Sequence, residues 1–183
     1  MRIAILNGEP DPGSPFHAYV HALAGHLEAA GHAVSTLDLA RLELKGCQGC
    51  FGCWLKTPGE CVRHDDSARI CRTAIQSDLL VLASRIRLGT TSALLKRAVD
   101  QMIPLIHPHF CIQGGEMHHQ PRYARYPDFG LVLGPGPDTD ALDLEITREL
   151  WLRAARNLKL GRGTLALADR PAQEVAHALT AAA

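Results

Sequence analysis

Four cysteines lie close together in the first half of the chain, at spacings that suit metal chemistry. Cys47, Cys50 and Cys53 are separated by gaps of two residues, and Cys61 follows after a gap of seven. Gaps of two let consecutive thiolates reach one iron–sulfur cluster, as in bacterial ferredoxin loops. The same sulfurs could bind a zinc ion, although zinc sites usually use two separated pairs, or could be thiols packed in a glycine-rich turn. The spacing leaves three interpretations open: a 4Fe–4S cluster, a zinc ion and no metal.

A second group of potential ligands lies in a stretch without clear periodicity. It consists of His107, His109, Glu116, His118 and His119. Imidazoles and a carboxylate are ligands for zinc or iron. They are not spaced four residues apart on a helix, so the sequence does not require them to converge. The alternative is a histidine-rich surface loop that lines a cleft or a subunit contact.

The loop after the first expected strand has features of an anion site. Ser14 is a candidate N-cap of the next helix, and the backbone N–H groups of Phe16 and His17 would point out of the helix start. With the helix dipole behind them, such groups attract phosphate. Every α/β protein has a similar helix start, and Glu9 and Asp11 in this loop would repel an anion unless they turn towards solvent.

The turn after the third expected strand lies opposite this loop. It contains Arg85, Ile86, Arg87, Leu88 and Gly89, and a capped amphipathic helix follows it. The simplest interpretation is a loop that leads into a helix. Its position adds a second interpretation, because a flat heterocycle placed between the two loops would contact both.

A regular alternation of strands and helices must position these residues. Short apolar runs predict strands, and apolar residues at a period near 3.6 predict amphipathic helices. The strands are expected at residues 3–6, 33–39, 79–83, 129–133 and 164–168, and the helices at about 15–30, 66–76, 91–106, 138–158 and 171–182.

This alternation predicts an α/β fold with a doubly wound, five-stranded parallel sheet. The second strand is polar, as an edge strand would be, which favours the flavodoxin-like order 2-1-3-4-5. A ligand is then expected outside the carboxyl ends of strands one and three. We expect a single domain over residues 1–183, with a cysteine-rich loop at 44–64 and a histidine-rich excursion at 107–127 as insertions.

Composition excludes several classes of protein. The 183 residues carry 19 Lys+Arg and 19 Asp+Glu, so no polycationic surface is expected and nucleic acid is not an expected partner. No uncharged run approaches the length of a membrane-spanning helix, and the apolar start is too short for a signal peptide. We expect a cytoplasmic protein with reduced thiols and no membrane partner.

Three motifs resemble the NADPH-dependent FMN reductase and iron–sulfur flavoprotein group of the flavodoxin-like superfamily. The first is the opening strand with Asn7-Gly8 and the loop to Ser14. The second is the segment from Cys47 to Asp66, and the third, from Gly89 to Asp100, is similar to the family's Gly-x-x-Ser-Ala-x-Leu-Lys-x-x-x-Asp stretch. The middle segment is the most specific of the three.

The resemblance implies that FMN binds without a covalent bond, with NAD(P)H as the electron donor. By position in the family, the phosphate would lie near Ser14, Phe16 and His17. The isoalloxazine ring would lie against the turn after the third strand, formed by Arg85, Ile86, Arg87, Leu88 and Gly89. Relatives commonly pair subunits, so a homodimer or homotetramer is expected, with residues 107–127 as the candidate contact.

These features lead us to expect an FMN-dependent oxidoreductase that takes hydride from NAD(P)H and passes electrons to a flavin, quinone or similar small acceptor. The flavin carries the chemistry, so no side-chain general acid or nucleophile is required. Arg85 or Arg87 could stabilise the reduced flavin anion or bind an NADP phosphate. Two alternatives remain: an electron carrier with FMN and an iron–sulfur cluster on the four clustered cysteines, and a structural or regulatory relative without flavin.

Overall fold

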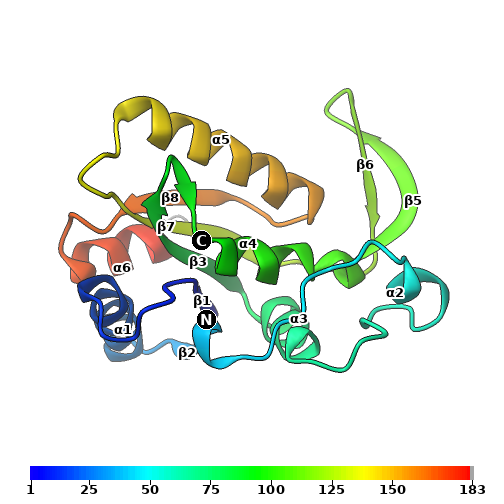
Figure 1. Cartoon of the computed structure of the whole chain (residues 1–183), viewed down its shortest axis with the longest axis horizontal. Coiled ribbons are helices and arrows are strands. Elements are labelled where there is room, and N and C mark those ends of the chain that lie inside the picture. Colours follow the sequence, from blue (N-terminus) through cyan, green and yellow to red (C-terminus); the bar gives the residue numbers. More distant parts are fainter. Residues whose placement is uncertain (182–183) are drawn as a thin grey trace.

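The computed structural model describes residues 1–181, and its main feature is a parallel sheet (Figure 1). Every neighbouring pair of its five long strands is parallel, in the order β2-β1-β3-β7-β8. This order confirms the flavodoxin-like prediction. The strands are β1 (Arg2–Asn7), β2 (Ala33–Asp38), β3 (Leu79–Arg87), β7 (Asp128–Gly134) and β8 (Gly163–Leu167).

Five helices cover the two faces of this sheet. They are α1 (Pro15–Ala29), α3 (Ser67–Gln76), α4 (Ala93–Asp100), α5 (Ala141–Asn157) and α6 (Ala172–Ala181). Side chains alternate between the faces of a strand, so Ile3 and Ile5 pack with α1 and α6, whereas Ala4 and Leu6 pack with α3, α4 and α5. The last expected helix includes residue 182, which lies outside the described residues.

The burial of the strands follows their place in the sheet. The first six residues of β3 are buried, as expected for a central strand covered on both faces. In β2 only Leu37 is buried, which agrees with its position at the edge. None of the helices in the described part of the chain is long and apolar enough to cross a membrane.

The third strand is longer than its apolar run predicts. It continues to Arg87 and turns back through Leu88 and Gly89 into a short antiparallel strand, β4 (Thr90–Thr91). The φ angles of Leu88 and Gly89 are +52° and +72°, as in the tight turns favoured by hairpins. The segment predicted as a loop is therefore the tip of a hairpin, and Arg85, Ile86 and Arg87 belong to β3.

The helix predicted at residues 91–106 is shorter than its periodicity suggests. Ser92 caps its start by accepting a hydrogen bond from the N–H of Leu95, but α4 ends at Asp100. A separate 3-10 helix, η2 (Ile103–Leu105), follows. Pro104 explains the break, because proline has no N–H to donate and its ring clashes with the preceding helical turn.

The stretch predicted as an irregular excursion contains a second sheet. Strands β5 (Ile106–Gln113) and β6 (Glu116–Pro121) form an antiparallel hairpin, which projects from the end of the molecule near the short helix α2 (Gly52–Leu55) (Figure 1). Gly114 and Gly115, both at positive φ, form its turn. A Gly-Gly pair between two strand-forming segments indicates a β-hairpin, so this hairpin could have been predicted from the sequence.

Candidate functional site

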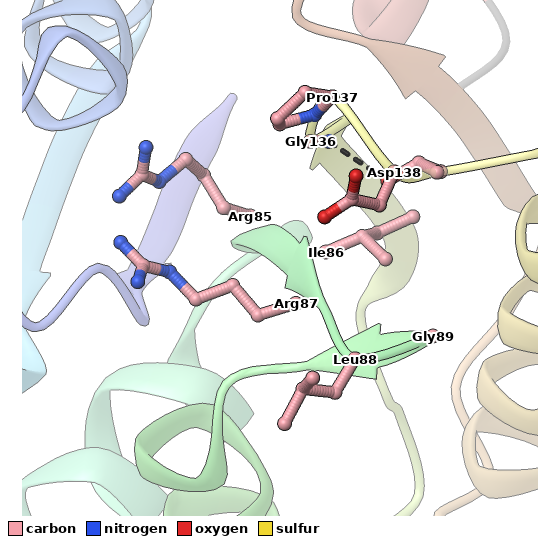
Figure 2. A pocket seen from close by; sticks show the side chains of 9 residues that line it. Arg85, Ile86, Arg87, Leu88, Gly89, Gly136, Pro137 and Asp138 are labelled. Atoms are coloured by element: carbon pink, nitrogen blue, oxygen red, sulfur yellow. Dashed lines mark hydrogen bonds between the residues drawn. The ribbon is translucent and has the colours of Figure 1, made fainter.

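A cavity opens at the carboxyl ends of β3 and β7, on the other side of β3 from the β1–β3 crevice where the strand order predicted a ligand. Its volume is about 520 Å³, within the range of small-molecule sites. One wall is the β3–β4 hairpin and the other is the loop after β7 (Figure 2). The first wall contains all five residues that the family resemblance assigned to a flavin ring: Arg85, Ile86, Arg87, Leu88 and Gly89.

The second wall was not predicted. It consists of Gly136, Pro137, Asp138 and Thr139, and the N–H of Gly136 donates to Thr139 Oγ1 at 2.8 Å to close the loop. Strand order could have revealed this wall, because β7 lies beside β3 and parallel neighbours end at the same edge. A side chain at Gly136 would begin 3.1 Å from the carbonyl oxygen of Ile86, so glycine there keeps the two walls close without a clash.

The two arginines of the first wall differ in their partners. Their guanidinium groups lie side by side and extend from the same side of β3 (Figure 2). Arg85 Nε is 2.9 Å from Oε2 of Glu9, which compensates its charge. Arg87 is exposed and has no ion-pair partner among residues 1–181. Arg87 is therefore the free cation at this cavity.

The hairpin tip rests on the start of α5. Thr147 Oγ1 donates to the carbonyl oxygen of Gly89 at 3.5 Å, and a Cβ on Gly89 would lie 2.9 Å from a carboxylate oxygen of Asp143. Leu88 at the same tip is fully exposed. Contacts with α5 thus fix the backbone of the turn, while the exposed side chain of Leu88 is available to a ligand.

The loop between β1 and α1 satisfies most of its own backbone hydrogen-bond donors. The N–H groups of Gly8, Ser14 and Ala18 donate to carbonyl oxygens, whereas the N–H of Phe16 has no partner among the described residues. Pro10, Pro12 and Pro15 have no N–H. The remaining donors use side chains of the loop: Glu9 N–H to Asn7 Oδ1 (3.2 Å), Asp11 N–H to Glu9 Oε1 (3.2 Å), Gly13 N–H to Asp11 Oδ1 (2.9 Å) and His17 N–H to Ser14 Oγ (3.1 Å). The carboxylates of Glu9 and Asp11 therefore accept two backbone hydrogen bonds that would otherwise be open to a bound anion.

The three residues assigned to phosphate by the resemblance have other contacts. Ser14 caps α1 as expected. Phe16 is buried at the point where β7 ends, since a Cβ on Gly134 would meet its ring at 2.6 Å. The imidazole of His17 lies 3.3 Å from Asp38. The N–H of His17 therefore already has a partner in Ser14, whereas the N–H of Phe16 at the start of α1 stays open to an anion.

The four clustered cysteines surround one smaller cavity of about 230 Å³. Its other walls are apolar and include Phe51, Trp54, Ile103 and Pro104, and all four sulfur-bearing residues line it: Cys47, Cys50, Cys53 and Cys61. Burial raises the pKa of the Cys53 thiol, and the thiols of Cys61 and Cys47 raise it further. The cysteines are all free, and four free thiols that line one apolar cavity are a ligand set suited to an iron–sulfur cluster.

The histidine-rich group does not form a metal site among the described residues. His118 Nε2 lies 3.2 Å from Glu116, whose carboxylate also binds Arg153 and Arg156 on α5. His119 instead packs on Trp54 of the cysteine segment, with ring centroids 5.1 Å apart. Glu116, His118 and His119 therefore join the hairpin to α5 and to the cysteine segment.

The parallel strand order and the cavity at the carboxyl ends of the strands define a flavodoxin-like α/β protein. Solved structures share this fold. The FMN-dependent NADH-azoreductase of Bacillus anthracis, determined with FMN, has a TM-score of 0.69 at 11% identity and covers 98% of both chains. The NAD(P)H:quinone oxidoreductase of Methanothermobacter marburgensis has a TM-score of 0.66 at 16% identity, over 100% of this chain and 95% of its own.

The chain belongs to the NADPH-dependent FMN reductase family, whose sequence profile matches residues 1–121. This confirms the resemblance seen in the motifs. An iron–sulfur flavoprotein of Archaeoglobus fulgidus is 29% identical over 107 residues, which make up 58% of this chain and 48% of the relative. The chain spans about half the length of the curated relatives it matches.

Proposed function

We propose that this protein is an NAD(P)H-dependent oxidoreductase that binds a flavin ring in the cavity between β3 and β7. It passes electrons to a flavin, quinone or similar small acceptor. The observation that carries the proposal is the cavity itself, whose two walls, the β3–β4 hairpin and the loop at residues 136–139, stand at the carboxyl ends of two parallel strands. Family membership supports it, and the family's name implies FMN as the flavin.

The residues of the cavity position the reactants rather than react. The residues that line the cavity would hold the ring of a flavin, which would supply the hydride and electron transfer between nicotinamide and acceptor. The turn at Leu88 and Gly89 sets the depth of the ring, and the exposed leucine side chain excludes water from the ring edge. No side-chain acid or nucleophile of the chain is needed.

Arg87 supplies the positive charge of the site. Because Glu9 already compensates Arg85, Arg87 is the group that can bind the extra phosphate of NADPH or stabilise a reduced, anionic flavin. A guanidinium is suited to both roles, since it stays charged and presents several donors in one plane.

The test is an assay of NADH and NADPH oxidation by the purified chain with riboflavin, FMN and a soluble quinone as acceptors. We expect oxidation that depends on both protein and acceptor. A chain that binds flavin but oxidises neither nucleotide would contradict the oxidoreductase, and a folded chain that binds no flavin would favour the flavin-less structural alternative.

A second candidate function is single-electron transfer through a 4Fe–4S cluster on the cysteine segment. The observation that favours it is the convergence of Cys47, Cys50, Cys53 and Cys61 on one apolar cavity, and three curated relatives are named iron–sulfur flavoproteins. Iron and sulfide analysis of anaerobically purified protein tests it. Flavin absorption without iron favours the reductase, whereas broad visible absorption bleached by dithionite favours the carrier.

We also propose that the chain forms a homo-oligomer through the β5–β6 hairpin. The hairpin exposes Phe110, Ile112 and Met117, an apolar group of the kind that subunit contacts cover. Light scattering on the eluting protein tests this proposal. A triple replacement of these residues by serine should convert the oligomer to a monomer, and a wild-type monomer would contradict it.

A further inference from the structure

The carboxylate of Glu9 is enclosed in the loop after β1, where it pairs with Arg85. Its side chain is fully buried. Arg85 Nε and Nη2 lie 2.9 and 3.5 Å from its two oxygens, and the N–H of Asp11 donates to it at 3.2 Å. One buried carboxylate thus takes both a cation and a backbone donor that a phosphate in this loop would use.

A phosphate group entering this loop would face two costs. It would place a second negative charge beside Glu9 in a site shielded from water, where repulsion is stronger than in solution. To reach Arg85 it would have to break the existing ion pair, and a buried carboxylate left without its partner is strongly unfavourable. A flavin tail without phosphate meets neither cost.

We propose that this chain recognises flavin by its ring alone, so that riboflavin binds at least as tightly as FMN and exchanges freely as a substrate. This inference rests on the proposed function, since it requires the flavin ring to occupy the cavity between β3 and β7. The name of the family specifies FMN, whereas in this chain the phosphate of FMN would add nothing to the binding affinity. The residue that sets this specificity is Glu9.

Titration of the full chain with riboflavin and with FMN, followed by quenching of flavin fluorescence, tests the inference. A riboflavin Kd no higher than the FMN Kd supports it. A lower Kd for FMN overturns it and leaves the proposed function intact. Binding of neither flavin overturns the proposed function and this inference with it.

Glu9→Ser provides the second arm. Removing the carboxylate frees Arg85, so FMN affinity should rise by about tenfold or more, the scale of one close charge pair, while riboflavin affinity stays within about twofold. The matched control is Glu174→Ser, which removes an exposed carboxylate paired with Arg170 on α6 and should change neither Kd. An unchanged FMN affinity in Glu9→Ser would overturn the inference.

A separate group of side chains, next to this loop, has the composition of a metal site. His17 and His21 lie one turn apart on α1, and Asp38 ends the neighbouring strand β2. One ligand atom from each lies within 4.8 Å of the others. The Oδ1 atom of Asp38 is 3.3 Å from His17 Nε2 and 3.1 Å from His21 Nε2.

Two observations point to a ligand at this position. Ligand atoms around a tetrahedral zinc ion, at bond lengths near 2.0 to 2.1 Å, are about 3.3 Å apart, and the observed separations match this. In addition, His17 Nε2 is buried without a hydrogen-bond partner in the described part of the chain, although buried polar atoms are normally paired. Asn7 Nδ2 donates to Asp38 Oδ1 at 2.9 Å and holds the carboxylate in place.

The geometry points to a site for a zinc-type divalent ion on His17, His21 and Asp38, with a fourth position open to water. Calorimetric titration of the metal-free chain with Zn²⁺ tests it by counting equivalents, because the free thiols of the cysteine segment are further potential zinc ligands. Wild type should bind one equivalent more than His21→Ala or Asp38→Asn. The control His26→Ala, an exposed histidine on the same helix, should match wild type. Equal stoichiometry in all four proteins would overturn the site.

Discussion

Arg85 Nε lies 2.9 Å from Oε2 of Glu9, although 76 positions separate the two residues in the chain. This ion pair joins the end of β3 to the loop after β1, the two segments that meet at the switch point of the sheet. It links Arg85, which lines the cavity between β3 and β7, to the carboxylate of Glu9 in the loop between β1 and α1. The same ion pair therefore stabilises the fold and occupies a cation that the phosphate of a ligand would otherwise bind.

Replacing Arg85 alone should destabilise the protein. Arg85→Met leaves the buried Glu9 carboxylate without its cation, and we expect a loss of about 2–3 kcal/mol in the free energy of unfolding, below the value for a fully buried pair because Arg85 is partly exposed. Urea denaturation measures it. The double variant Glu9→Gln, Arg85→Met should recover most of the loss, and Arg170→Met, from an exposed pair, should cost less than about 1 kcal/mol. A single variant as stable as wild type would contradict the account of this pair.

Replacing Arg87 should reduce the preference for NADPH. Arg87→Gln removes the free cation of the cavity, and a charge-assisted phosphate contact contributes about 1.5–3 kcal/mol. We therefore expect kcat/KM for NADPH to fall by about tenfold or more, with a smaller change for NADH. Initial rates with both nucleotides provide the measurement. Equal losses for NADH and NADPH would instead assign Arg87 to the flavin anion.

A side chain at Gly89 should displace the turn that forms one wall of the ring cavity. Gly89→Val places a branched side chain at a φ of +72° and 2.9 Å from Asp143 behind the turn, so the turn must shift and flavin binding should be lost. The matched control is Gly115→Val, also in a hairpin turn at positive φ, where a Cβ meets nothing within 4 Å. Flavin titration compares them. Full flavin binding by Gly89→Val would show that the ring lies elsewhere.

Docking of the β5–β6 hairpin on α5 should weaken in acid. Hydrogen bonds from Arg153, Arg156 and His118 lower the pKa of Glu116 from 4.5 to about 2. Because the folded-state pKa is depressed, this contribution is present above pH 4.5 and is lost as the pH falls towards 2. Hydrogen exchange of the β6 amides should accelerate over this interval. Glu116→Gln should show fast exchange already at neutral pH; slow exchange in that variant would exclude Glu116 as the anchor.

The strand order and the first wall of the cavity could be predicted because they depend on local patterns. The apolar run at Leu79–Ala83 marks a central strand, and polar residues in β2 mark an edge. The length of β3 could not be read in this way, since Arg85 and Arg87 are polar residues that pairing with β4 holds in a strand. Pro104 limited α4 although the apolar period continued past it.

The contacts that decide the site are long-range. Asp138 and Thr139 follow the fourth strand of the parallel sheet, and nothing in their local sequence shows that they face Leu88 and Gly89. The Glu9 side chain points inward because it pairs with Arg85. Arg85 lies 76 positions away in the sequence, so the residues of the loop alone cannot predict this orientation. Sequence patterns therefore placed the site at the carboxyl edge of the sheet but between the first and third strands, whereas the cavity lies between β3 and β7.

The most direct test of the central proposal is a crystal structure of the chain grown with riboflavin. The account predicts electron density for the isoalloxazine ring between the Leu88–Gly89 turn and the loop at residues 136–139, with the ribityl chain outside the loop that contains Glu9 and with the Glu9–Arg85 pair intact. Density for the ring at any other site, or a cavity closed by Arg87 and Leu88 at saturating riboflavin, would contradict it.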